Sequence, residues 1–224
     1  MRNAVRNSSA GFAKTGLLLG CLGALLVGLV LFALYGVGVY NRLVGLDEAV
    51  KRQWSQVENQ YQRRYDLVPN LVRTVQGAAD FERGTLQAVV EARARVGQVA
   101  LPGGAPGSAP SPTENPAAFQ QFEAAQAGLS SALSRLLVVV ERYPELKANQ
   151  NFLELQSQLE GTENRIAVER GRYNETAQAF NEAARRFPAS LIAGMLGFKQ
   201  KVYFEATAGA QQPPSVDFDF SGTQ

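Results

Sequence analysis

The sequence predicts an all-α protein in which a single N-terminal transmembrane helix is followed by an elongated antiparallel helical bundle. Residues 15–41 include no charged side chain, and this run is longer than the roughly 20 apolar residues that cross a bilayer. After it, apolar residues recur at steps of three and four, the spacing of one helical face. These patterns predict a long first helix kinked by a proline, and then two helices with the 3.5-residue repeat of coiled coils.

The N-terminal region predicts an uncleaved, single-pass anchor in the cell (inner) membrane. Residues 1–14 are a short basic tail and residues 15–41 are the anchor. Basic residues flank the anchor equally, so the positive-inside rule leaves the side of the soluble domain open. Small residues spaced four apart form a groove that suits a packing partner, although glycine is common in membrane helices anyway. They are Gly16, Gly20, Ala24 and Gly28.

The first soluble helix is expected from about residue 43 to about residue 97, and it is compatible with direct continuation of the anchor. Its apolar stripe keeps its phase across Pro69, which predicts one helix bent near residues 65–69 rather than two helices and a turn. The stripe consists of Leu43, Leu46, Val50, Trp54, Val57, Tyr61, Tyr65, Val68, Val72, Val75 and Ala79.

Pro69 deprives the carbonyl of Tyr65 of its helical hydrogen bond, so a buried carbonyl here needs another donor. Asp66 lies among the nearby arginines and is placed to orient them. The alternative is that these charged residues form a solvated helix face. The nearest candidate donors are Arg63, Arg64 and Asn70.

Trp54 is the only tryptophan, and it lies on the apolar stripe of the first helix. That position predicts burial in the core against the two later helices. The alternative is an exposed anchor for a partner, because tryptophan is frequent at interface hot spots.

Residues 101–116 contain five prolines together with glycine, serine and alanine, which predicts a flexible surface loop. Asn115-Pro116 is expected to start the next helix. That helix has an unbroken stripe with alternating steps of three and four. The stripe consists of Phe119, Phe122, Gln126, Leu129, Leu133, Leu136, Val140 and Tyr143.

The following helix has a longer stripe with the same alternating steps of three and four residues. We expect it to pack antiparallel to the previous helix. Polar residues interrupt its stripe, and such positions commonly specify register. Glu169 is expected to pair with an arginine, either of its own helix or of the first helix. The alternative is that the helix rotates slightly and Glu169 reaches water. The stripe consists of Phe152, Leu155, Leu159, Thr162, Ile166, Glu169, Tyr173, Thr176, Phe180, Ala183 and Phe187.

Residues 191–224 follow the bundle, which we assign to residues 42–190. The apolar segment 191–198 is too short to cross a membrane. We expect it to cap the end of the bundle, and the alternatives are the membrane surface or a docked partner. The alternating segment 216–220 suits an extended strand or a peptide ligand.

Composition excludes several classes of function. Of the 22 basic residues three precede position 15, so 19 basic residues face 20 acidic residues in the soluble part. This balance argues against nucleic-acid binding. The chain has no histidine, and its only cysteine, Cys21, is in the anchor. These facts exclude a soluble disulfide framework, a thiolate zinc site and histidine general-base chemistry.

Several separate blocks occur in order along the region 40–220. They are Tyr40-Asn41-Arg42-Leu43-Val44, Trp54-Ser55-Gln56-Val57, residues 63–72, Thr85-Leu86, Glu91-Ala92-Arg93, Asn164-Arg165-Ile166, Arg170, Tyr173-Asn174, Phe187-Pro188 and Gly197-Phe198. Together these blocks resemble the LemA family. The resemblance implies a membrane-anchored helical domain and no particular activity. The proline-rich insert departs from the family pattern, because it is longer than such a domain needs.

We therefore expect a membrane-anchored scaffold or adaptor that contacts the lipid bilayer and binds other membrane or membrane-associated proteins, or further copies of itself. We expect no catalysis, cofactor, nucleic acid or small-molecule substrate. One alternative is a self-assembling scaffold that shapes membranes. The other is an enzyme with a carboxylate-bridged metal site, which normally uses inward Glu-x-x-His pairs that this chain lacks.

Overall fold

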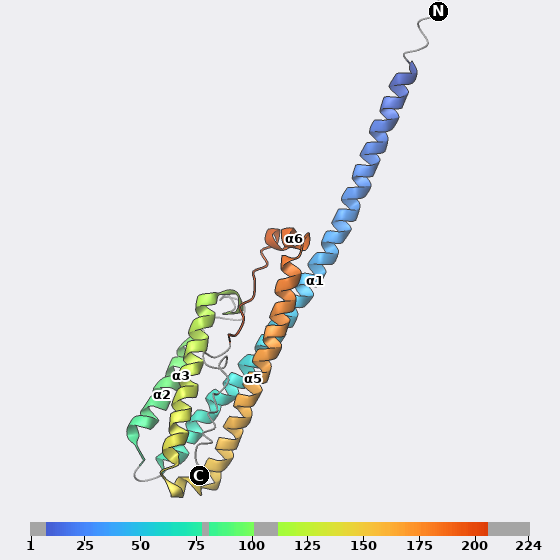
Figure 1. The fold of residues 1–224 in the computed structure, drawn as a ribbon. Helices are drawn as coiled ribbons and strands as arrows, with labels where there is room; N and C mark the ends of the chain where they lie inside the picture. Colours follow the sequence, from blue (N-terminus) through green and yellow to red (C-terminus); the bar gives the residue numbers. More distant parts are fainter. Residues whose placement is uncertain (1–7, 78–80, 101–111, 206–224) are drawn as a thin grey trace, which may run out of the picture. The chain divides into compact units, whose positions relative to one another are not determined.

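The computed structural model describes residues 8–77, 81–100 and 112–205, and every regular element in these ranges is a helix (Figure 1). The all-α class is therefore confirmed. The elements are α1 (Ser8–Gln76), α2 (Arg83–Ala100), the 3-10 helix η1 (Pro112–Glu114), α3 (Pro116–Val140), α4 (Pro144–Lys147), α5 (Gln150–Arg185) and α6 (Ala189–Met195).

Contacts divide the chain into two compact units. We call residues 1–56 and 175–201 the anchor unit, and residues 57–174 and 202–224 the bundle unit. Helices α1 and α5 each contribute residues to both units.

Helix α1 is continuous for 69 residues and includes Pro69, so the first soluble helix continues directly from the apolar run, as the sequence allowed. From Leu22 onward it contains an 18-residue stretch that has a mean hydropathy of 2.4 and no buried residue. In the described part of the chain, it is the one helix long and apolar enough to cross a membrane. The bend near Pro69 stays a prediction.

The predicted extension of this helix to residue 97 is wrong, because α1 ends at Gln76 and α2 begins at Arg83. Gly77, a weak helix former, follows the end of α1. The reversal places Val89 and Val96, which are 0% and 2% exposed, in the same core as the end of α1. Burying this second apolar stripe on the first favours two helices over one.

One hydrophobic core joins α1, α2, α3, α4 and the beginning of α5 in the bundle unit. The chain reverses between α3 and α5, which are antiparallel as predicted (Figure 1). The core consists of Leu67, Val68, Leu71, Val72, Val75, Phe81, Leu86, Val89, Ala92, Val96, Leu129, Leu133, Leu136, Val139, Val140, Leu146, Phe152 and Leu159.

The stripe of α3 is buried as predicted from Phe119 to Val140, whereas Tyr143 is half-buried. Asn115 caps α3 by accepting the N–H groups of Ala117 and Ala118, and Pro116 occupies the first turn.

Residues 112–116 are not the loop that we expected. Thr113 is 2% exposed, and its carbonyl accepts the N–H of Val202 at 2.9 Å. Residues 101–111 lie outside the described residues.

The predicted stripe of α5 is wrong at its C-terminal end. Beyond Tyr173, Phe180 is buried as predicted, but the other buried residues are Ala177, Asn181 and Ala184 in place of Thr176 and Ala183, while Phe187 is 82% exposed. An α-helix has 3.6 residues per turn and drifts about 20° per heptad from a 3.5-residue repeat. The buried face therefore moves by one position along a helix of this length.

In the anchor unit, the segment 191–198 contacts both α1 and α5. A Cβ built on Gly36 would lie 4.0 Å from Ile192 Cδ1. The ring of Phe198 is 6.3 Å from that of Tyr40 and 6.0 Å from that of Phe180. The cap over the end of the bundle stays a prediction.

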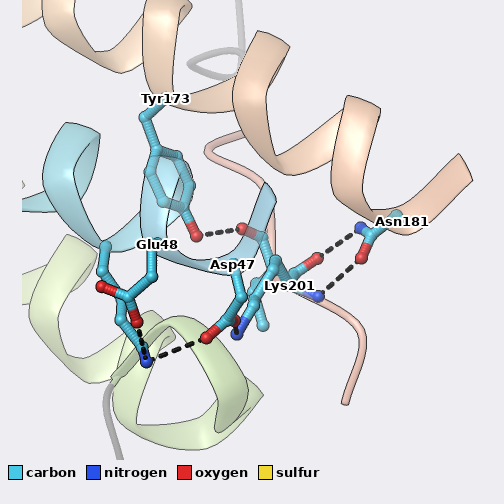
Figure 2. Close-up of polar contacts among 7 residues, drawn as sticks. Asp47, Glu48, Tyr173, Asn181 and Lys201 are labelled. Atoms are coloured by element: carbon cyan, nitrogen blue, oxygen red, sulfur yellow. Dashed lines mark hydrogen bonds and ion pairs between the residues drawn. The ribbon is translucent and has the colours of Figure 1, made fainter. Parts of the chain in front are cut away.

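A buried ion pair closes the anchor unit (Figure 2). The Lys201 ammonium is 2.6 Å from Asp47 Oδ1, and the two side chains are 2% and 13% exposed. Lys51 also contacts Asp47, at 2.9 Å. The Asn181 side chain donates to the Lys201 carbonyl and accepts its N–H, both at 2.8 Å.

In the bundle unit, residues 202–205 are held in an extended conformation by polar side chains of α5. Tyr173 donates to the carbonyl of Val202 at 2.8 Å (Figure 2). Asn174 donates to the carbonyl of Phe204 and accepts its N–H, both at 2.9 Å. The alternating segment 216–220, which suits an extended strand or a peptide ligand, lies outside the described residues.

Trp54 is 5% exposed, so we expect its fluorescence to be blue-shifted and weakly quenched by iodide. Trp54→Ala should lower the free energy of unfolding by about 3–5 kcal/mol, whereas Trp54→Phe should retain most of it. Urea unfolding of the full chain in detergent measures both. Red emission with strong iodide quenching would assign Trp54 to the surface.

Asp47→Asn should destabilise the folded chain, because it leaves the buried ammonium of Lys201 without its charged partner; removing one member of a buried pair costs about 3–5 kcal/mol. Glu48→Gln is the control, since Glu48 is an exposed partner of Lys51. This substitution should change the free energy of unfolding by less than ~1 kcal/mol. Urea unfolding at neutral pH compares the two.

The same pair predicts a pH dependence. Burial raises the pKa of Asp47, but hydrogen bonds and charges from Lys201 and Lys51 outweigh it and lower the pKa below its ordinary 3.8. Because the folded-state pKa is the lower one, the stabilisation is present above pH 3.8 and is lost as the pH falls through the folded-state value. The stability difference between the parent and Asp47→Asn should therefore shrink in acid. A difference that stays constant would contradict this linkage.

Candidate interaction site around Arg64

Arg64 lies inside the bundle unit with 1% of its surface exposed. It comes from the face of α1 that also carries Tyr61 and Val68. Its Nη1 donates to Ser130 Oγ at 2.7 Å and to Glu163 Oε1 at 2.6 Å. Its Nη2 donates to the side chain of Gln126. One guanidinium therefore links α1 to α3 and α5.

The burial of Arg64 is compensated by charge and by an aromatic face. Glu163, which is 43% exposed, carries the opposite charge, and the Tyr61 ring centroid is 5.1 Å from Arg64 Cζ. Burial raises the pKa of Tyr61, although the charges of Arg170 and Arg64 oppose this rise. Arg64 Nε has no hydrogen-bond partner among the described residues.

A second ion pair lies on the same face of the bundle unit. Arg170 is 3.1 Å from Glu123 Oε1 and donates to the carbonyl of Glu205 at 3.2 Å. Its guanidinium also covers the ring of Phe204 at 4.5 Å. Burial raises the pKa of Glu123, and Arg170 opposes the rise.

An open groove of about 510 Å³ connects the two pairs. Its walls carry Arg64 with Glu163 and Arg170 with Glu123, and between them α3 presents small residues that are exposed or half-buried. These are Ala124, Ala127, Ser130 and Ser131. Fixed charges of both signs around small side chains suit recognition of a polar segment of another protein. The groove contains no histidine or cysteine to serve as a base or nucleophile.

Elsewhere the structure offers no metal centre in its described residues, since no group of three His, Cys, Asp or Glu side chains is placed to hold an ion.

The carbonyl freed by Pro69 does receive a donor, but not one that we predicted. Arg93 Nε of α2 donates to the carbonyl of Tyr65 at 3.2 Å. Its guanidinium also lies 3.8 Å from the centroid of the Tyr65 ring. A residue 28 positions away therefore replaces the missing helical bond.

The predicted residues around Pro69 are otherwise separated. Arg63, Asp66 and Asn70 are exposed. Asp66 accepts a hydrogen bond from Gln62 at 2.9 Å, and Asn70 accepts one from Arg73 at 2.6 Å. Only Arg64 of this group enters the candidate site.

Glu169 pairs with Arg172 of its own helix at 2.8 Å and is 16% exposed. The glutamate that pairs with the first helix is Glu163. In the anchor, Gly20 and Gly28 have no side chain near them in the described residues, and Ala24 is exposed. The side-chain surroundings of Gly16 lie outside the description.

Sequence reasoning missed Ser130, Glu163 and Arg93. Gln126 carried a signal, because it is a polar residue on an otherwise apolar stripe. Glu163 carried none, since it lies off the predicted stripe among many exposed acids.

Comparison with known proteins adds a family and three relatives. The model of the LemA family matches residues 53–218. Magnetosome proteins MamQ 1 and MamQ 2 of Paramagnetospirillum magneticum are each 28% identical to this chain over 184 residues, covering 78% of this chain and 67% of theirs. Magnetosome protein MamQ of Magnetospirillum gryphiswaldense matches with the same identity and coverage.

Glu163→Gln should destabilise the bundle more than Arg64→Met. The first leaves a buried charge unpaired, at a cost of about 3–5 kcal/mol. The second leaves the buried amide of Gln126 without its partner, at about 1–3 kcal/mol. Adding Gln126→Leu to Arg64→Met should recover much of that loss, because both partners are then apolar.

Arg63→Met is the matched control and should change stability by less than about 0.5 kcal/mol, since Arg63 is exposed. Urea unfolding measures all four variants. Equal effects of Arg63→Met and Arg64→Met would show that the buried network does not stabilise the bundle.

Proposed function

This chain belongs to the LemA family, and we propose that it acts as a membrane-anchored scaffold or adaptor whose groove around Arg64 binds a segment of a partner protein. The candidate transmembrane helix α1 supports a membrane-anchored protein. We propose residues 15–41 as a single-pass anchor in the cell (inner) membrane, residues 42–190 as the partner-binding helical domain and residues 191–224 as an additional segment.

The groove is the observation that carries this proposal. Its charged walls are already paired, by Glu163 with Arg64 and by Glu123 with Arg170. Because each buried charge already has its counter-charge, a partner only needs to add hydrogen bonds to these pairs. Such contacts favour specificity over very tight binding. The exposed Ala127 in the groove allows a partner backbone to approach closely. We propose no catalytic step.

A second candidate function is self-assembly into a scaffold that shapes a membrane. The small residues of α1 support it, because Gly20, Ala24 and Gly28 leave one face open for a second copy. In that case the partner is the chain itself. The relatives are named magnetosome proteins, and either role is compatible with that name.

Crosslinking in intact membranes tests the proposal and separates the two candidates. Ala127→Trp fills the groove, and Ala94→Trp is the matched control, since Ala94 is an exposed alanine of α2 outside the groove. We expect the parent and Ala94→Trp to crosslink the same proteins and Ala127→Trp to lose them. Recovery mostly of the chain itself would support self-assembly. Partners unaffected by Ala127→Trp would exclude the groove.

A further inference from the structure

Helix α6 and its flanking residues expose large apolar side chains within ten positions of one another. Isolated apolar residues on a surface need no explanation, whereas a cluster does. Leu191 and Met195 are four residues apart and therefore on one face of α6. Only Ala193 of this helix is buried. The exposed fractions are 82% for Phe187, 58% for Leu191, 87% for Met195 and 51% for Leu196.

The contacts of α6 place it beside the end of the uncharged part of α1. Ile192 is next to Gly36, and Phe198 is next to Tyr40. Both α1 residues precede Arg42, the first charged residue after the run. At 1.5 Å per residue, Gly36 is about 9 Å from Arg42 along the helix axis.

This level on α1 corresponds to the boundary of a bilayer. The uncharged run is about 40 Å long at the helical rise, which exceeds the roughly 30 Å of the hydrocarbon core. A run of this length extends beyond the hydrocarbon core. Tyr35 and Tyr40 are 46% and 45% exposed here, and tyrosine is typical of the headgroup layer.

The charges around α6 complement a lipid surface. No acidic residue occurs between Glu182 and Glu205. Arg185 and Lys199 are exposed. Arg186 is exposed as well and pairs with Glu182 at 3.4 Å, whereas Lys201 is paired internally. An apolar helix face flanked by cations is the pattern of helices that lie in the interface of anionic membranes.

We propose that α6 is a second membrane contact, which lies in the bilayer interface at the C-terminal end of the transmembrane part of α1. Its exposed apolar side chains enter the boundary of the acyl chains, and the flanking cations face anionic headgroups. The lipid is favoured over a soluble partner because α6 packs on the anchor itself. The contact is independent of the groove around Arg64, and it gives the anchor unit two attachments.

Depth-dependent quenching in the full chain tests this proposal. A fluorophore is attached to Met195→Cys in a Cys21→Ala background, and the protein is placed in nanodiscs of phosphatidylcholine and phosphatidylglycerol. Val37→Cys, which is 59% exposed, is the reference for the membrane boundary on α1, and Val138→Cys, an apolar position of α3 that is 71% exposed, is the reference in water.

We expect the label at 195 to be quenched by acyl-chain nitroxides as at 37, and to be shielded from iodide. The reverse pattern, as at 138, would overturn the proposal. Shielding from iodide without quenching by lipid would also overturn it, because a protein would then cover α6.

A charge on the same face provides the second measurement. Leu191→Asp should restore iodide access to the label at 195 and abolish its quenching by lipid. Leu153→Asp changes another exposed leucine, on α5, and should leave both signals unchanged. Lipid quenching that survives Leu191→Asp would contradict an interfacial α6.

Discussion

The burial of a single positive charge, that of Arg64, constrains the packing of the bundle unit. Removing a guanidinium from water is tolerable only when its donors find partners. Those partners, Gln126 and Ser130 on α3 and Glu163 on α5, occupy single positions on their helices. Apolar stripes alone tolerate a slide by one turn, since another apolar residue takes each place. The polar cluster does not tolerate it, and we infer that it specifies the register of three helices.

Pro69 presents a similar problem on a smaller scale. A proline inside a helix leaves one carbonyl without a donor. The guanidinium of Arg93 supplies that bond and covers the Tyr65 ring. Because this donor comes from α2, the defect in α1 is compensated only when the chain has reversed after Gln76. The reversal and the intact helix through Pro69 therefore depend on each other.

The anchor unit uses the same chemistry to hold its last segment against α1. Lys201 pairs with Asp47 out of water, and Asn181 makes both backbone hydrogen bonds of Lys201. These contacts fix the end of the connection that starts with α6. Such fixed contacts suit the scaffold role that we propose, because each freely rotating connection adds an entropic cost to binding.

The sequence by itself determined the helical class, the apolar anchor, the stripe of α3 and the start of that helix at Asn115-Pro116. These features depend on local periodicity and on residues adjacent in the chain. The tertiary structure alone decided where α1 ends, which donor serves Tyr65 and which acid meets Arg64. The partners of Arg64 are 62 to 99 positions away, and many exposed acids and amides of the sequence offer the same chemistry. Only the packing of the apolar stripes determines which of them comes within hydrogen-bonding distance.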